Sequence, residues 1–481
     1  MSDPRRSFLQ LVTLLVALGG GCLGATEPLT RAEARAALLR AVEFFRLEVS
    51  ANGGYVWRYS ENLTCREGER RAGAHTVWVQ PPGTPTVGDA LLTVYYRTDD
   101  PEYLAAAKET AMALVNGQLH SGGWDYRIEF DPVQRGKFAY RVDGPAMDEW
   151  NVTTLDDSTT QAALSFLMRV DQATRFQDTN IHQAALYALE RLIEAQYPNG
   201  AWPQGFSASP EPARYPVLHA AYPESWSRRY PNRGYMSFYT FNDNTIGDTI
   251  RIMFEAAGIY GDSKYVRAAE RAGDFILMAQ MPEPQPAWAQ QYDFAMHPAW
   301  ARKFEPPSIT GGESQQVLAT LMSLYRQTGK AKYLQPVPKA LAYLRESQLS
   351  DGRLARFYEL RTNLPLYFTK DYRLTYRSDD LPGHYRFHVV SQLDSLEAEY
   401  RWLRSSPSEA SRRRSRPPRT QSTSDLSRRA SAIVKQMDDR GAWVEDGRLS
   451  SCGAKNARRR IVSTQTFVRN IDALSQFIAE H

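Results

Sequence analysis

A helical pattern recurs along this chain, and its period limits the chain to a few architectures. Five amphipathic stretches, with apolar residues at i, i+3, i+4 and i+7, each end on a glutamine. This spacing is typical of a helix with one buried face. In four of the five, a glycine follows the glutamine within five residues, and glycine is a usual helix stop. The glutamines are Gln118, Gln196, Gln280, Gln348 and Gln436, separated by 78, 84, 68 and 88 residues. Each unit is therefore two helices long.

Tandem helical hairpins either stack as an open solenoid or close into a toroid. The loops between these units are long and aromatic, and long loops gathered at one end of a toroid can build a site. We therefore predict an all-α fold, an (α/α) toroid or incomplete barrel of helical hairpins whose long loops form a cleft. Residues 29–403 are expected to form this toroid, and residues 429–481 to add a final unit that closes it against the first.

Residues 404–428 differ in composition from the helical units. They are basic, rich in serine, arginine and proline, and almost without large apolar side chains. Such a segment cannot bury a core, so we predict a disordered insert; a tether that binds a cell wall or a polyanion is the alternative. Closure of the ring across this insert would bring Cys452 towards Cys65, and a disulfide between them is left open.

The first 25 residues resemble an export signal. Arg5 and Arg6 precede an apolar run from Leu11 to Leu18, as in twin-arginine signals. We expect an exported protein, periplasmic or secreted, with lipid anchoring through Cys22 as an alternative. An uncleaved membrane anchor is a third reading, but the run is shorter than the roughly 20 residues that span a bilayer. No later segment is apolar enough to span one.

Charge and aromatic content narrow the class of partner. The net charge of +4 is small for 481 residues and much of it lies in the basic insert, so nothing indicates nucleic acid as a partner. The 26 tyrosines and 10 tryptophans suit a protein that stacks rings on sugars, and they equally suit a thick core. The oligomeric state is not indicated.

Two loops place carboxylates and amides directly before a helix. In TTLDDSTTQ these are Asp156 and Asp157, and in YTFNDNTIGDTI they are Asn242 and Asp243. Capping of the helix explains one such side chain, but two adjacent carboxylates exceed what a cap needs. Carboxylate and amide oxygens are the ligands that calcium prefers, and no His or Cys cluster indicates a softer metal. The second loop, with Asn242, Asp243 and Asn244, therefore offers a site for a hard cation such as calcium, and a helix N-cap is the alternative.

Two further loops carry charges in unusual places. PAWAQQYDFAMHPAWARKFEPPSITGGES contains Arg302 in a proline-rich setting, and its Thr310-Gly-Gly-Glu313 fits a helix capping box. FYELRTNLPLYFTKDY, residues 357–372, is extended, aromatic and crossed by charges, with Arg356 just before it. An extended segment whose charges only face water is the alternative for this last loop.

The order of these loops resembles that of the family 10 pectate lyases, the pectic acid lyase family. The resemblance runs from about Asp156 to Asp371 and rests on DDSTTQ, AQYPNGAWPQ, TFNDN, AWAQQYD with ARKFEPPSITGGES, and RFYELRTNLPLYFTKD, in that order. It implies an incomplete helical toroid and calcium-assisted β-elimination of polygalacturonate, an acidic polysaccharide. The reaction needs cations that neutralise the C6 carboxylate of a uronate and stabilise the enediolate, and a base over C5.

The resemblance also implies roles for single residues. Asp243 with Asn242, and Asp156 or Asp157, would lie at the calcium site. Arg302 and Arg356 match arginines that bind the substrate carboxylate, and Arg386 is a candidate for a further one. Lys370 stands where the family has its arginine base, and lysine gives up its proton more readily than arginine. The aromatic residues expected to bind substrate are Trp202, Tyr239, Trp288 and Tyr358.

Two other functions remain open at this point. Helical toroids also host glycoside hydrolases, for which Asp243 and Asp156 or Asp157 would be the paired carboxyl groups. The excess of arginine disfavours this reading, because an oxocarbenium-like transition state is not stabilised by nearby cations. The third reading is a non-catalytic protein that binds acidic polysaccharide and tolerates the loss of Lys370.

Overall fold

The computed structural model describes residues 28–145, 147–405, 423–452 and 458–481. The predicted export signal and most of the predicted insert lie outside these ranges. The main helices, in chain order, are α1 (Arg31–Phe44), α2 (Thr84–Thr98), α3 (Pro101–Asn116), α5 (Thr159–Ala173), α6 (Thr179–Glu194), α7 (Thr245–Tyr260), α8 (Ser263–Met278), α9 (Gly311–Thr328), α10 (Val337–Glu346), α11 (Leu393–Ser405), α13 (Thr423–Lys435) and α14 (Thr464–Glu480).

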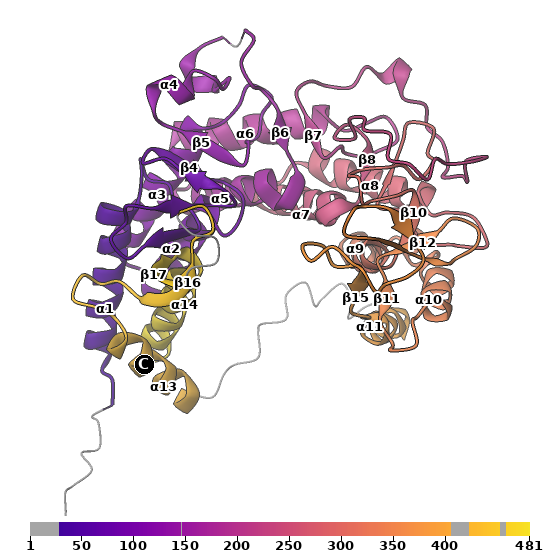
Figure 1. Ribbon diagram of the computed structural model, residues 1–481. Helices are drawn as coiled ribbons and strands as arrows, with labels where there is room; N and C mark the ends of the chain where they lie inside the picture. The colour runs from indigo at the N-terminus through magenta and orange to yellow at the C-terminus, as the bar shows by residue number, and fades with distance from the viewer. Residues whose placement is uncertain (1–27, 146, 406–422, 453–457) are drawn as a thin grey trace, which may run out of the picture.

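The helices form two layers along an open arc (Figure 1). In the inner layer α14 contacts α2, α2 contacts α5, α5 contacts α7, α7 contacts α9, and α9 contacts α11. In the outer layer α1, α3, α6, α8 and α10 each pack on an inner helix. This confirms the predicted all-α toroid of helical hairpins. The arc is open between α11 and α13, so the toroid is incomplete.

The repeated glutamines join neighbouring units. The buried Gln118 side chain donates from Nε2 to the carbonyls of Gly122 in its own loop and of Ala184 in α6, both at 2.9 Å. Gln196 does the same in the next unit, with the carbonyls of Gly200 at 2.9 Å and Ala268 at 3.0 Å. Gln118 and Gln196 thus tie the end of one outer helix to the next outer helix, which gives this residue type a structural role at the end of these hairpins.

The repeated tryptophans are structural as well. Trp202 and Trp288 are fully buried, and their Nε1 atoms donate to the carbonyls of Leu192 at 2.8 Å and Ile276 at 2.9 Å. Trp124 makes the equivalent bond to Leu114 at 2.8 Å. The prediction that Trp202 and Trp288 bind sugar is therefore wrong, because neither ring has a face open to a ligand.

The first and last units meet in a five-stranded antiparallel sheet. Its order is β16 (Val444–Arg448), β17 (Arg458–Ser463), β1 (Arg58–Ser60), β2 (Arg66–Glu67), β3 (Arg71–Ala72). A disulfide joins Cys65 to Cys452, with Cα atoms 6.3 Å apart, across 387 residues of sequence. This settles the bond that the sequence left open.

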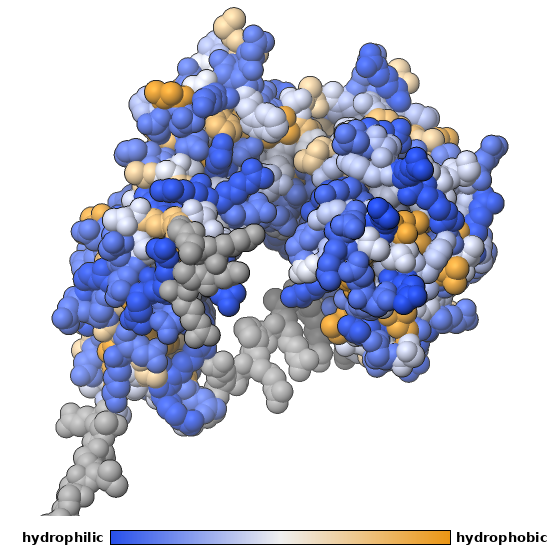
Figure 2. All heavy atoms as spheres, in the orientation of Figure 1, coloured by the Kyte–Doolittle hydropathy of each residue, from blue (hydrophilic) through white to orange (hydrophobic). Residues whose placement is uncertain are grey.

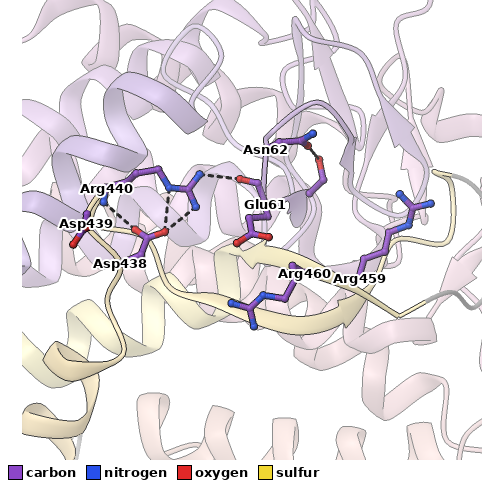
Figure 3. Close-up of a pocket in the computed structure, with 8 residues that line it drawn as sticks. Glu61, Asn62, Asp438, Asp439, Arg440, Arg459 and Arg460 are labelled. Atoms are coloured by element: carbon purple, nitrogen blue, oxygen red, sulfur yellow. Dashed lines mark hydrogen bonds and ion pairs between the residues drawn. The ribbon is translucent and has the colours of Figure 1, made fainter.

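A shallow pocket lies where the first and last units meet (Figure 3). Beside it, Arg440 donates to the carbonyl of Glu61 at 2.9 Å and to the carboxylate of Asp438 at 2.8 Å. The last unit is therefore held to the first by the sheet, the disulfide and this arginine.

Short strands arrange the loops at one end of the helices. The pairs are β4 (Thr76–Trp78) with β5 (Arg127–Glu129), β6 (Thr153–Thr154) with β7 (Gly205–Phe206), β8 (Tyr239–Thr240) with β9 (Gln291–Tyr292), and β11 (Leu354–Ala355) with β15 (His388–Val389). A four-stranded sheet has the order β10 (Ser308–Thr310), β12 (Phe357–Glu359), β13 (Pro365–Phe368), β14 (Leu374–Thr375). The face seen in Figure 2 is mostly hydrophilic, with apolar side chains scattered singly.

Candidate functional site

The acidic loops form the same turn twice. Strand β6 leads through a 3-10 turn, Asp156–Ser158, into α5, and β8 leads through Asn242–Asn244 into α7. In both turns a threonine hydroxyl accepts a hydrogen bond from the backbone two residues on: Thr154 from Asp156 at 3.3 Å, and Thr240 from Asn242 at 3.0 Å. Because α5 and α7 are adjacent inner helices, the two turns lie against each other.

Each turn holds two residues in the left-handed region. Asp157 and Ser158 have φ of 49° and 56°, and Asp243 and Asn244 have φ of 47° and 58°. Residues other than glycine rarely adopt this conformation, although short polar side chains tolerate it best. Backbone strain of this kind is concentrated at functional sites. Here it brings the two turns' carboxylates together.

The three carboxylates form one cluster. Asp156, Asp157 and Asp243 each offer an oxygen, and these oxygens lie within 4.8 Å of one another. Tyr126 donates to Asp156 and Asn242 to Asp243, both at 2.7 Å. The second oxygen of Asp156 and the amide oxygen of Asn242 are buried and have no partner within the described part of the chain.

Crowding of the three carboxylates disfavours their ionised forms. Burial, and then the charges of Asp156 and Asp157, raises the pKa of Asp243 to about 7. Burial and the charge of Asp156 raise the pKa of Asp157 to about 6, although part of this side chain is exposed. The cluster is therefore short of positive charge when all three groups are ionised. Its unpartnered oxygens and its purely oxygen-based donors fit a hard divalent cation such as calcium.

Two arginines approach the cluster, and each is held by a buried glutamate. Arg302 donates to Glu305 through Nε at 2.8 Å and through Nη2 at 2.5 Å. Arg356 donates from Nη2 to Glu313 at 2.8 Å. The positive charge of Arg302 acts on Asp157 to lower its pKa, opposing the larger effect of burial.

Tyr385 joins the two arginines. Its ring centroid lies 4.7 Å from the guanidinium carbon of Arg356 and 5.7 Å from that of Arg302. Its hydroxyl donates to Glu305 at 2.9 Å. A guanidinium over an aromatic face is stabilised electrostatically, so Tyr385 fixes both forks in one orientation.

Glu313 does not form the predicted capping box with Thr310. Thr310 stands at the N-cap of α9, yet its side chain makes no capping bond. The Glu313 carboxylate is buried and accepts from Arg356 instead. The local sequence matches a cap, but the carboxylate binds Arg356, which lies between β11 and β12, 43 residues along the chain.

The two tyrosines predicted to bind sugar are core residues. Tyr239 is fully buried against Phe275 and Phe294. Tyr358 is 1% exposed and donates to the carbonyl of Ser347 at 2.6 Å. Neither ring offers a face for stacking, so this part of the prediction is wrong.

Lys370 and Arg386 are exposed and lie outside the cluster. The side chain of Lys370 is 71% exposed and its Nζ lies 3.1 Å from Asp380. Within the described residues, it makes no ion pair with the cluster. Arg386 is exposed, while its neighbour Tyr385 occupies the site. Their predicted roles in substrate binding and proton abstraction stay predictions.

Sequence reasoning missed Tyr385 and Tyr126, which no local motif marks. It also missed that the two acidic loops are one repeated motif. Thr-Leu-Asp-Asp-Ser-Thr from Thr154 and Thr-Phe-Asn-Asp-Asn-Thr from Thr240 align residue by residue, 86 positions apart. This alignment was the available signal that the loops form the same turn and meet.

A family model for pectic acid lyase matches residues 118–354. Over this segment the chain is similar to the pectic acid lyases. The match includes both acidic turns and Arg302 and ends just before Arg356. The match supports a polysaccharide lyase.

Solved structures with a similar fold include several enzymes that act on carbohydrates. A mutant family 10 polysaccharide lyase from Cellvibrio cellulosa, in complex with trigalacturonic acid, is 20% identical with a TM-score of 0.44, covering 67% of this chain and 98% of that chain. A D-mannose isomerase is 11% identical with a TM-score of 0.43, covering 94% and 98%. A family 76 α-mannanase from Bacteroides thetaiotaomicron is 10% identical with a TM-score of 0.41, covering 93% and 95%.

Two further searches gave negative results. No curated protein matches the chain. Among the helices of the described residues, none combines the length and the apolar character needed to cross a membrane.

Proposed function

We propose that the protein cleaves pectate, a polymer of galacturonate, by β-elimination with calcium bound at Asp156, Asp157, Asp243 and Asn242. The observation that carries the proposal is the placement of three crowded carboxylates beside two preoriented arginines. Such a site can hold a cation and an anionic substrate at the same time. The pectic acid lyase family supports the choice of a uronate polymer.

β-Elimination removes the C5 proton, and the C5–H electron pair forms a C4–C5 double bond. The C4–O bond breaks with its electron pair on the leaving glycosidic oxygen, which takes a proton from water. The C5 proton is weakly acidic while C6 carries a full negative charge. When bound, calcium would supply positive charge that offsets this carboxylate. Arg302 and Arg356 would bind it through their planar forks, which Glu305 and Glu313 hold in position before substrate arrives.

Lys370 is our proposed base, because it stands where the pectate lyases of family 10 have their arginine base. Its neutral amine would take the C5 proton on Nζ, which requires Nζ to lie within hydrogen-bond reach of that proton. The ion pair with Asp380 sets a condition for this role. Nζ has to leave Asp380 and turn towards the substrate, which its exposed position allows.

The geometry is less suited to glycoside hydrolysis. Hydrolases need two carboxyl groups about 5 to 9.5 Å apart on opposite sides of a glycosidic bond. Here the oxygens of three carboxylates lie within 4.8 Å of one another. Such crowding suits a shared cation better than two separate roles in acid and base catalysis.

We also propose that the protein is exported, to the periplasm or beyond. The disulfide between Cys65 and Cys452 supports this, because such bonds persist in oxidising compartments. The twin-arginine-like start of the sequence is the second reason.

The test is incubation with polygalacturonate and calcium, read as absorbance of an unsaturated uronide. The absorbance should rise with calcium and stay flat with EDTA. Failure to form unsaturated product from any uronate polymer would overturn the proposal. Saturated products would indicate a hydrolase, and binding without turnover would indicate a binding protein.

A further inference from the structure

A second cavity, of about 700 Å³, lies beside the candidate site. The segment around Tyr230, the loop that contains Lys303, and the β13–β14 hairpin enclose it. Four cationic side chains line it and no carboxylate does. They are Arg228, Arg229, Lys303 and Arg373.

Three of these four cations are not neutralised by the protein. Arg228 forms an ion pair with the buried Glu359 and is therefore part of the wall. Arg229, Lys303 and Arg373 are exposed, and within the described residues they make no ion pair. Like charges around one cavity repel each other, and a bound anion relieves that repulsion. The cavity is therefore built to attract negative charge.

Aromatic rings form the rest of the lining. Trp300 lies at the base, where its Nε1 donates to the carbonyl of Ser227 at 2.9 Å and its ring packs 6.1 Å from that of Phe368. Tyr372 is half-buried, and the Nζ of Lys303 lies 3.5 Å from its ring centroid. Tyr376 is 48% exposed. Trp300 is buried and the ring of Tyr372 is covered by Lys303 and Phe304, so Tyr376 is the ring of this lining that a sugar can contact.

A cavity that is lined by cations and aromatic rings, with no carboxylate, suits an acidic sugar. Arginine binds a carboxylate with paired hydrogen bonds, and the exposed ring of Tyr376 can cover the apolar side of a pyranose. A nucleic acid would also be anionic. However, the cavity adjoins a site that already fits a uronate polymer, which favours the same polymer as the ligand.

Short contacts link the cavity to the arginine pair. Lys303 follows Arg302 directly in the chain. Phe304 packs against Tyr385 of the site, with centroids 4.6 Å apart, and against Tyr372 of the cavity, with centroids 5.7 Å apart. A polymer held by Arg302 would therefore reach the cavity by extending along Phe304.

We propose that this cavity is a distal subsite that binds a further uronate residue of the polymer being cleaved. The proposal rests on the proposed function. Binding away from the reacting bond stabilises the bound substrate and the transition state equally, so it lowers KM and leaves kcat unchanged. The subsite should matter only for substrates long enough to reach it.

The test compares the double variant Lys303→Ala, Arg373→Ala with wild type on polygalacturonate and on trigalacturonate. We expect KM for the polymer to rise about tenfold, with kcat unchanged and no change for the trimer. Arg377→Ala is the matched control, because Arg377 is exposed just beyond the same hairpin and pairs with Asp379 instead of lining the cavity. It should behave as wild type. Equal KM values for the double variant and wild type on the polymer would overturn the subsite while leaving the lyase intact.

A binding measurement separates the subsite from the lyase activity. Binding of polygalacturonate is measured by calorimetry at low salt in EDTA, with a neutral polysaccharide as the comparison. If no unsaturated product forms at all, the proposed function fails. A tenfold loss of polygalacturonate affinity in the double variant would still support the subsite, and unchanged affinity would overturn it.

Discussion

Asp243→Asn should change how the stability of the metal-free protein depends on pH. The pKa of Asp243 in the folded protein is about 7, against an ordinary value of 3.8. The folded state therefore holds this proton more tightly than the unfolded chain does. Stability from this group is present at low pH and is lost as the pH rises from about 4 to about 7.

The size of the effect follows from the same two values. A tenfold change in a proton affinity corresponds to about 1.4 kcal/mol, so the shift at Asp243 corresponds to a loss on the order of 4 kcal/mol. Asparagine keeps the shape of the side chain but cannot ionise. The variant should lose less stability than wild type between pH 5 and pH 8, and it should be the more stable protein at pH 8 in EDTA.

Calcium should offset most of the wild-type deficit at pH 8. A ligand at a hundred times its Kd stabilises the folded state by about 2.7 kcal/mol, and this gain requires the carboxylate that the variant lacks. The assay is urea unfolding at pH 5 and pH 8, in EDTA and in calcium, with the exposed Asp439→Asn as control. Equal pH dependence in EDTA for wild type and Asp243→Asn, or equal stabilisation of both by calcium, would refute the reasoning.

Three further predictions concern the proposed base, the repeated glutamines and the disulfide that joins the first and last units. Lys370→Ala should lower kcat on polygalacturonate far more than it raises KM, and Lys370→Arg should retain activity; equal kcat for Lys370→Ala and wild type would remove Lys370 from the mechanism. Gln196→Ala should lower the free energy of unfolding by about 2 kcal/mol, because it leaves two buried carbonyls without their donor; an unchanged urea midpoint would contradict the role given to the repeat. Replacing Cys65 and Cys452 together with serine should cost about 2 to 4 kcal/mol, and equal thermal midpoints for this variant and reduced wild type would show that the effect comes from the bond itself.

The fold could be predicted because the residues that determine it recur from one helical unit to the next. Apolar periodicity sets the helices, and the recurring glutamine and glycine set where they end. The same repeat also contained the reason why Trp202 is structural. A tryptophan that recurs at the same place in several hairpins serves what those hairpins share, which is packing and not a single site.

The candidate site could be predicted only in its local parts. Asp156, Asp157 and Asp243 stand out because adjacent polar side chains before a helix exceed the needs of a cap. Their crowding, and with it the raised pKa of Asp243, depends on two turns 86 residues apart meeting in space. Residues joined across loops, such as Glu313 with Arg356, give no local pattern at all.

The identity of the product tests the central claim most directly. Polygalacturonate is digested with calcium in water labelled with heavy oxygen, and the oligomers are weighed by mass spectrometry. β-Elimination takes up no water, so the account predicts unlabelled ends that carry a C4–C5 double bond and are lighter than saturated ends by one water molecule. Saturated ends that carry the heavy oxygen would show hydrolysis and would contradict it.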